Sequence, residues 1–180
     1  MRPVRIRALK RAKTYVGVKE HPSGSNRGLH IDRWNQWATQ ERFPPKGITG
    51  FPWCASFVCG MFREIGYVVP LPLRASVGYL ELWAAGIGKV LKLGVRPRSG
   101  DLVVYRFDSD NWPDHIGFVD KVLAVKWTGG RFIGTIRTVE GNTSAGNDAN
   151  GGQVQVRYRS ALRCTFIRID VNNLKKVEGF

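Results

Sequence analysis

The sequence predicts an α+β fold in which N-terminal helices pack on a C-terminal antiparallel sheet of about five or six strands. Up to residue 100, apolar residues recur every three or four positions, which is the period of amphipathic helices. Beyond residue 100, short runs of alternating apolar and polar residues are separated by clusters of Gly, Asn, Asp and Pro, as in strands joined by turns. Helices that precede the strands, rather than alternating with them, are typical of the α+β class. The 180 residues are 43% hydrophobic, so the chain is long and apolar enough for one domain with its own core.

Two helices are predicted in the first forty or so residues from apolar stripes. A loop rich in turn formers, "KEHPSGSNRG", separates them, and a further short helix is predicted in "VGYLELWAAGIGKV". The inward positions are Ala8, Leu9, Ala12, Tyr15 and Val16 in the first helix, and Ile31, Trp34 and Trp37 in the second.

A central helix is predicted between Pro52 and Gly66, because Pro suits a first helical position and Gly suits a helix end. Its spacing places Cys54 in the first turn, on the inward side. The inward stripe consists of Phe57, Val58, Met61, Phe62 and Ile65.

Cys54 has two interpretations. A cysteine on an apolar helix face is ordinarily a small buried hydrophobe, and this is the expectation for Cys59 and Cys164. Cys54 differs because the free N–H groups and the macrodipole at a helix N-terminus favour a thiolate, which is the nucleophilic form. All three cysteines are expected to be free thiols, since Cys54 and Cys59 lie too far apart on a helix to form a disulfide.

Five strands are predicted from alternation, at 101–107, 115–125, 131–141, 152–159 and 164–170. Gly129-Gly130 predicts a two-residue hairpin turn. If this turn sets the register, Asn142 lies opposite Gly117 and Glu140 lies opposite Val119. His115, Glu140 and Asn142 then share one face of the sheet, because side chains alternate with a period of two. Direct pairing of His115 with Glu140 requires a register four residues tighter, hence a longer loop or a bulge.

A cysteine nucleophile needs a base, and the chain has three histidines. His21 and His30 flank a Gly/Ser loop and are expected to be solvated. His115 begins a predicted strand, where its side chain can reach a cleft; the alternative is an ordinary surface residue. A carboxylate or amide from Glu140 or Asn142 would fix the tautomer of His115 and stabilise its charged form.

The net charge of +14 predicts attraction to polyanions, such as nucleic acid, anionic lipid or an acidic wall polymer. No zinc-finger spacing or single-strand-binding motif accompanies the charge, so no specific nucleic acid is expected. No apolar run reaches membrane-spanning length, which predicts no membrane insertion. The basic N-terminal segment lacks the apolar region of a signal peptide, and synthesis in a cytoplasm is expected.

An ordered set of motifs spanning roughly residues 5–170 resembles the CHAP family of cysteine amidases and peptidases, which have papain-like folds and cut peptidoglycan. The motifs are "GFPWCASFV", "RPRSGDLVVYRF", "DHIGFVDKV", "VEGNTS" and "GGQVQVRYR". The resemblance implies that Cys54 is the nucleophile, His115 the base and acid, Glu140 the group that orients His115, and Asn142 a fourth polar member. Candidate substrate-binding residues are Ser25 and Asn26, whose loop resembles a stretch near the family's substrate groove, together with Trp53 and Trp112.

The resemblance implies a peptidoglycan hydrolase of the phage endolysin type, either an N-acetylmuramoyl-L-alanine amidase or an endopeptidase. Residues 1–170 would form the catalytic domain, and 171–180 a polar tail or the start of a linker. The expected partners of the monomer are peptidoglycan and anionic wall polymers. No cofactor is expected. Some relatives bind calcium through an Asp-rich loop before the cysteine, but only Asp32 and Glu41 are acidic between the first loop and Cys54, so no metal is expected.

Two alternatives stay open at this level. The same chemistry would serve a tail-associated lysin or a bacterial wall hydrolase. A basic nucleic-acid-binding protein with an incidental cysteine belongs to a different class, and thiol alkylation should distinguish it from a cysteine hydrolase.

Overall fold

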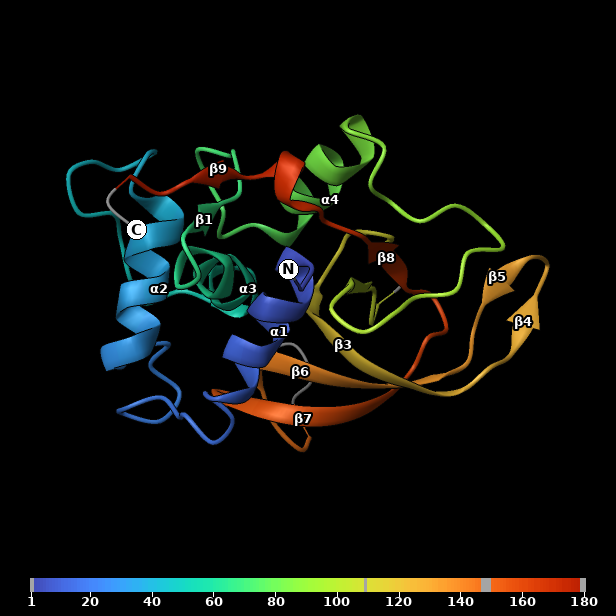
Figure 1. Cartoon of the computed structure of the whole chain (residues 1–180). Helices are drawn as coiled ribbons and strands as arrows, with labels where there is room; N and C mark the ends of the chain where they lie inside the picture. The colour runs from blue at the N-terminus through green and yellow to red at the C-terminus, as the bar shows by residue number, and fades with distance from the viewer. Residues whose placement is uncertain (1, 109, 147–149, 179–180) are drawn as a thin grey trace.

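The computed structural model describes residues 2–108, 110–146 and 150–178, and these form the predicted α+β arrangement (Figure 1). Four α-helices lie in the first half of the chain and an antiparallel sheet in the second. The helices are α1 (Val4–Lys13), α2 (Leu29–Thr39), α3 (Cys54–Arg63) and α4 (Val77–Gly86). Within the described residues, no helix combines the length and the apolarity that crossing a bilayer requires.

The main sheet has five antiparallel strands in the order β7-β6-β3-β2-β8, which confirms the five predicted runs. Its strands are β2 (Leu102–Tyr105), β3 (His115–Ala124), β6 (Thr135–Thr143), β7 (Gln153–Ser160) and β8 (Thr165–Ile167). Two small sheets pair β1 (Tyr67–Val68) with β9 (Lys175–Lys176), and β4 (Trp127–Thr128) with β5 (Arg131–Phe132).

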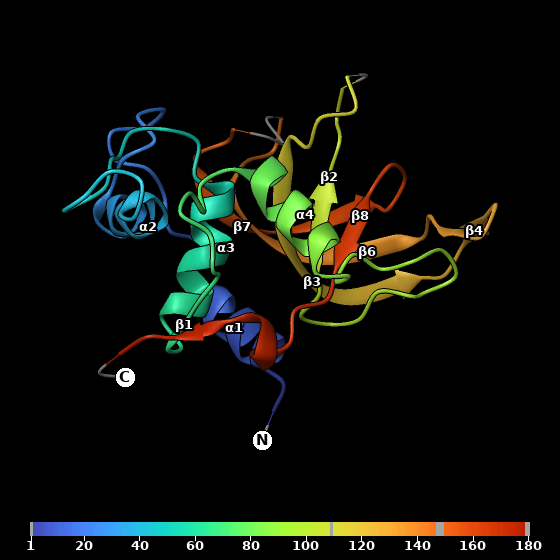
Figure 2. The same cartoon turned by 90° about the horizontal axis from the view of Figure 1, so that it is seen from above.

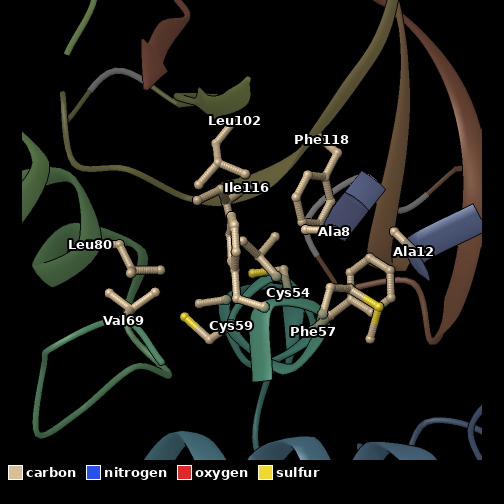
Figure 3. Packing of buried hydrophobic residues seen from close by; sticks show 14 of the residues in the cluster. Ala8, Ala12, Cys54, Phe57, Cys59, Val69, Leu80, Leu102, Ile116 and Phe118 are labelled. Atoms are coloured by element: carbon tan, nitrogen blue, oxygen red, sulfur yellow. The ribbon is translucent and has the colours of Figure 1, made fainter. Parts of the chain in front are cut away.

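Helix α3 lies at the centre of the core, between α2 on one side and the sheet on the other (Figure 2). Every residue from Cys54 to Phe62 is buried. The sequence predicted one buried face for this helix, whereas the structure buries all of its faces. Leu102, Ile116 and Phe118 approach α3 from the sheet, and Ala8 and Ala12 approach it from α1 (Figure 3). Burial among these apolar groups raises the pKa of Cys59 to about 12, so Cys59 is an inert thiol.

Three boundaries differ from the prediction. Helix α3 begins at Cys54 with Trp53 as its N-cap, so Pro52 precedes the helix instead of opening it. Val16 is 45% exposed because α1 ends at Lys13, before the predicted stripe is complete. The expected polar tail is ordered through Lys176: a 3-10 turn (η1, Val171–Asn173) leads into β9 on the edge of β1. Residues 179–180 lie outside the described residues.

The predicted register between β3 and β6 is wrong by two residues, although the predicted face is right. The Gly129-Gly130 turn is present, since Thr128 pairs with Arg131, but it closes only β4 and β5. Between β3 and β6, two bulges each shift the pairing by one residue, and Gly117 therefore faces Glu140. A single bulge would have turned Glu140 to the opposite face, whereas two bulges restore it.

Candidate active site

Cys54 is the first residue of α3 and keeps 5% of its surface exposed. The first backbone hydrogen bond of the helix runs from the N–H of Phe57 to the carbonyl of Trp53, at 2.8 Å. The N–H groups before Phe57 consequently have no partner within the helix. Their partial positive charge lies beside the sulfur and favours its anionic form.

Trp53 fixes the start of α3 from inside the core. It is fully buried, its Nε1 donates to Oε1 of Glu20 at 2.8 Å, and its ring packs against Trp34 and Phe57. An indole held in this way offers no face to a substrate. The structure therefore gives Trp53 a packing role in place of the expected substrate contact.

His115 is the first residue of β3 and is completely buried. Its Nε2 lies 3.1 Å from Oε2 of Glu140, and its ring stacks on Tyr105. Its Nδ1 has no hydrogen-bond partner among the described residues, yet the Cys54 sulfur acts on the imidazole strongly enough to raise its pKa. With Nε2 occupied by Glu140, Nδ1 is the nitrogen available to the sulfur.

Two glycines let these elements approach each other. A Cβ at Gly117 would lie 2.6 Å from Cγ of Glu140, so the bare backbone of β3 leaves room for the glutamate side chain to cross toward His115. A Cβ at Gly141 would lie 2.7 Å from the Phe57 ring, so β6 packs directly against α3. The site depends on these two close approaches.

The imidazole is charged at neutral pH. Burial alone would lower the pKa of His115, but the interactions with Cys54 and Glu140 outweigh burial and raise it from 6.5 to about 9. Burial likewise opposes ionisation of Glu140, but His115 and Arg159 hold the pKa of this carboxyl well below its usual range. The pair is thus an imidazolium and a carboxylate.

Arg159 on β7 is a member of the site that the sequence reasoning missed. It is 8% exposed and forms a bidentate pair with the carboxylate of Glu140: Nη2 donates to Oε2 at 2.7 Å, and Nε donates to Oε1 at 3.1 Å. The Tyr105 hydroxyl also donates to Oε1 of Glu140 at 3.0 Å, and the Thr138 hydroxyl donates to the same oxygen at 2.5 Å. The buried carboxylate of Glu140 thus has two cationic neighbours, His115 and Arg159, which compensate its charge.

The sequence contains only a weak signal for Arg159. Alternation along "GQVQVRYR" places Gln155, Arg157 and Arg159 on one face of a strand, and this is the face of Glu140 because Gln155 pairs with Glu140. The pattern cannot show which of the two arginines reaches the carboxylate.

Asn142 lies at an irregularity between β6 and β7, with φ of +61°. Its Nδ2 donates to Oδ1 of Asn150 at 3.0 Å, and no hydrogen bond between described residues joins it to His115. The structure brings Cys54, His115 and Glu140 together and places Asn142 near the end of β6, two residues beyond Glu140.

The remaining candidate substrate residues lie near this centre. A hollow of about 310 Å³ is lined by Lys19 and Glu20 and by parts of the segments 23–24 and 150–153. Because Glu20 holds Trp53, the hollow adjoins the start of α3. Ser25 uses its hydroxyl within its own turn, donating to the Pro22 carbonyl at 2.5 Å, and Asn26 is half-buried with a φ of +54°.

Trp112 is the most exposed of the candidate residues. Its side chain is 57% exposed, and its ring lies so close to Gly78 on α4 that a Cβ there would be 2.4 Å from Cζ2. It thus occupies a fixed surface position three residues before His115. A contact with substrate there stays a prediction.

Three carboxylates before His115, from Asp108, Asp110 and Asp114, lie within 4.8 Å of one another. Each already accepts a hydrogen bond from a backbone N–H of the same loop, those of Asp110, Trp112 and Phe107 respectively. These bonds give the carboxylates a role in shaping the loop.

The charged state of His115 predicts an alkaline limit to activity. An imidazole that acts as an acid must carry a proton, so any activity that uses His115 in this way should fall as pH rises through about 9. The raised pKa of His115 also stabilises the folded state. This contribution to the unfolding free energy is complete below pH 6.5, the ordinary pKa of histidine, and is lost as pH rises through about 9.

Replacing Glu140 with Gln removes an interaction that raises the pKa of His115, so the alkaline limb of the pH–activity profile should move to lower pH. Rates measured across pH for wild type and Glu140→Gln test this, and coincident limbs would exclude Glu140 from the proton-transfer unit.

Comparison with known proteins gives one finding. The sequence model of the CHAP domain matches residues 46–142, which is more than half of the chain and includes Cys54, His115, Glu140 and Asn142. No curated protein and no solved structure matches the chain.

Proposed function

Because the chain belongs to the CHAP domain family, a family of hydrolases that comprises amidases and peptidases, we propose that it is a peptidoglycan hydrolase that cleaves an amide bond through Cys54. The observation that carries this proposal is a buried histidine whose Nε2 lies 3.1 Å from Glu140 and whose pKa is raised by the sulfur of Cys54, a cysteine at a helix start. Burying an ion pair costs desolvation free energy. Titratable groups with strongly shifted pKa values are concentrated at functional sites.

The proposed reaction proceeds in two steps. The Cys54 thiolate attacks the amide carbonyl carbon, and the free N–H groups at the start of α3 donate to the oxyanion that forms. The C–N bond breaks as the Nδ1 proton of His115 passes to the leaving amine, which leaves a thioester on Cys54. His115, now neutral, takes a proton from water; the hydroxide attacks the thioester, and the acid product leaves as the thiolate and imidazolium are restored.

Glu140 and Arg159 act on His115 in this scheme and do not touch the substrate. Glu140 accepts from Nε2 and so keeps the other nitrogen, Nδ1, directed at the sulfur. Arg159 holds the carboxylate in that position by its two hydrogen bonds.

The proposal extends to the bond and to the biological role. The target is the amide between the glycan and its stem peptide, or a peptide bond within the stem or cross-bridge. We assign the role of a phage endolysin, for which the net charge of +14 is the supporting feature, since an anionic wall retains a cationic enzyme.

Fragment analysis of digested wall tests this function. Purified peptidoglycan incubated with the enzyme should release new amines, and mass spectrometry should show either intact stem peptides with peptide-free glycan or shortened and uncoupled peptides. The first pattern identifies an amidase and the second an endopeptidase. A Cys54→Ala digest serves as the blank. New reducing sugar ends without new amines would overturn the proposal, because cleavage of the glycan requires different chemistry.

A further inference from the structure

The part of the molecule around the β4–β5 hairpin, remote from α2 and α3, is rich in positive charge. Three segments, 82–100, 121–139 and 149–169, contain twelve Lys or Arg residues and no Asp or Glu. The loop before β2 and the β4–β5 hairpin meet there, with the N–H of Gly94 donating to the carbonyl of Gly130 at 2.7 Å. Figure 2 shows the hairpin at the end of the sheet remote from α2 and α3.

Six exposed cations from these segments surround two adjoining hollows, and we name them the distal basic surface: Lys92, Arg96, Arg98, Lys121, Arg131 and Arg163. The smaller hollow, of about 210 Å³, is lined by Lys92, Arg131 and Arg163, and the larger by the other three. Both hollows share Gly94 and Val95, so the six cations form one continuous surface.

None of these six side chains forms an ion pair or side-chain hydrogen bond with any residue the structure describes. The single acidic residue in either hollow, Asp120, is buried and already pairs with Lys13 and with Arg137 at 2.7 Å. Other cations of the same segments are used inside the fold, such as Arg159 on Glu140 and Arg168 on Asp101. Among the residues that the structure describes, the distal basic surface therefore has no internal counterion, a property that fits an external polyanion.

Its composition points to phosphate groups. Four of the six residues are arginines, whose planar guanidinium matches the oxygens of a phosphate in a two-point contact. Exposed apolar groups lie between them, with Leu93 at 65% and Val95 at 39% exposure, which suits a polymer whose phosphates are separated by short carbon units.

The surface is also separated from the catalytic centre. His115 begins β3, and Lys121, the member of the surface that lies on this strand, is six residues farther along, or about 20 Å for an extended strand. A polymer bound at the distal basic surface would leave Cys54 free to act on a neighbouring peptide.

We propose that the distal basic surface binds a phosphodiester-linked polyanion of the bacterial wall and so holds the enzyme next to its substrate. The proposal rests on the proposed function for the choice of wall polymer over other polyanions. It names a surface and a ligand chemistry that the catalytic site does not require.

The test compares two triple variants that change net charge equally. Lys92→Ser/Arg131→Ser/Arg163→Ser removes the cations of the smaller hollow. Lys10→Ser/Arg42→Ser/Lys46→Ser removes three exposed cations elsewhere, which also have no ion pair among the described residues. Binding is measured by titration with purified poly(glycerol phosphate), with poly(glutamate) and a DNA duplex of similar charge as comparison probes.

We expect wild type to bind poly(glycerol phosphate) more tightly than the other two probes. The distal variant should lose roughly 100-fold in affinity, since a cation near a polyanionic surface contributes about fivefold. Its dependence on log salt should become shallower by about 2, given roughly 0.7 per phosphate contact on a flexible chain. The control variant should lose much less.

Equal losses in the two variants would show that diffuse net charge alone is responsible and would overturn the proposal. So would preference for the DNA duplex, equal binding of poly(glutamate), or no binding of the phosphate polymer. Cleavage of a soluble wall-peptide fragment is measured in parallel and should be unchanged in both variants. Absence of that cleavage in wild type would contradict the proposed function instead, and leaves the binding result interpretable.

Discussion

Replacing Cys54 with alanine should abolish wall hydrolysis, with a loss in rate of about four to six orders of magnitude. In the proposed reaction the sulfur is the atom that forms the covalent intermediate, and an alanine side chain has no atom that can replace it. The fold should survive, because the side chain lies at the start of α3 and retains only 5% exposure, so the change removes a single buried atom. Clearance of a wall suspension and the unfolding temperature measure the two effects.

Cys59→Ala is the matched control, since it removes the same atom from the same buried helix. It should keep full activity. Alkylation gives a second comparison: burial raises the pKa of both Cys59 and Cys164 to about 12, so both remain protonated thiols at neutral pH. Peptide mapping after mild iodoacetamide treatment should find the label on Cys54, with activity lost in parallel. Full clearance by Cys54→Ala, or labelling of Cys59 first, would contradict the assignment.

Replacing Arg159 with methionine should cost about 3–5 kcal/mol of unfolding free energy, because it leaves the Glu140 carboxylate buried beside one cation instead of two. The second substitution Glu140→Gln, added to Arg159→Met, should recover most of this loss, since the uncompensated charge is then gone. Urea unfolding of the two single variants and the double variant measures the coupling. Arg27→Met serves as the control, because its ion pair with Asp32 is exposed and should contribute about 0–1 kcal/mol.

Arg159→Met should also change the pH profile of whatever enzyme remains folded. Removing a cation that competes for Glu140 strengthens the hold of the carboxylate on the imidazolium, so the alkaline limb should move to higher pH. This is opposite in sign to the shift expected for Glu140→Gln. A stability loss with an unmoved alkaline limb would assign Arg159 a packing role only.

Much of the fold follows from local patterns. The helices around Trp34, Phe57 and Leu80 lie where apolar residues recur with a period of about 3.6. The five strands of the main sheet lie where the period is 2. The exceptions have local causes too. Val16 is exposed because the first helix ends early, and the C-terminal segment is ordered because the edge of β1 is available for pairing.

Sequence patterns predict only part of the candidate site. Cys54 stands out by its position at a helix start, and the shared face of His115 and Glu140 follows from counting along the strands. Arg159 does not stand out, because it is one of 28 basic residues and its partner lies on another strand. Trp53 was a candidate for substrate binding and is instead fully buried, since nothing in "FPWCAS" indicates that Glu20 will accept its N–H.

The sequence by itself determined that Cys54 lies at a helix start and that His115 and Glu140 share one face of the sheet, because these are short-range properties of spacing. Tertiary structure alone decided how far apart they are, through two bulges that bring Glu140 opposite Gly117 and two glycines that let backbone and side chains approach. It also decided the charge balance around His115, because the strength of a buried ion pair depends on which distant segments exclude water from it.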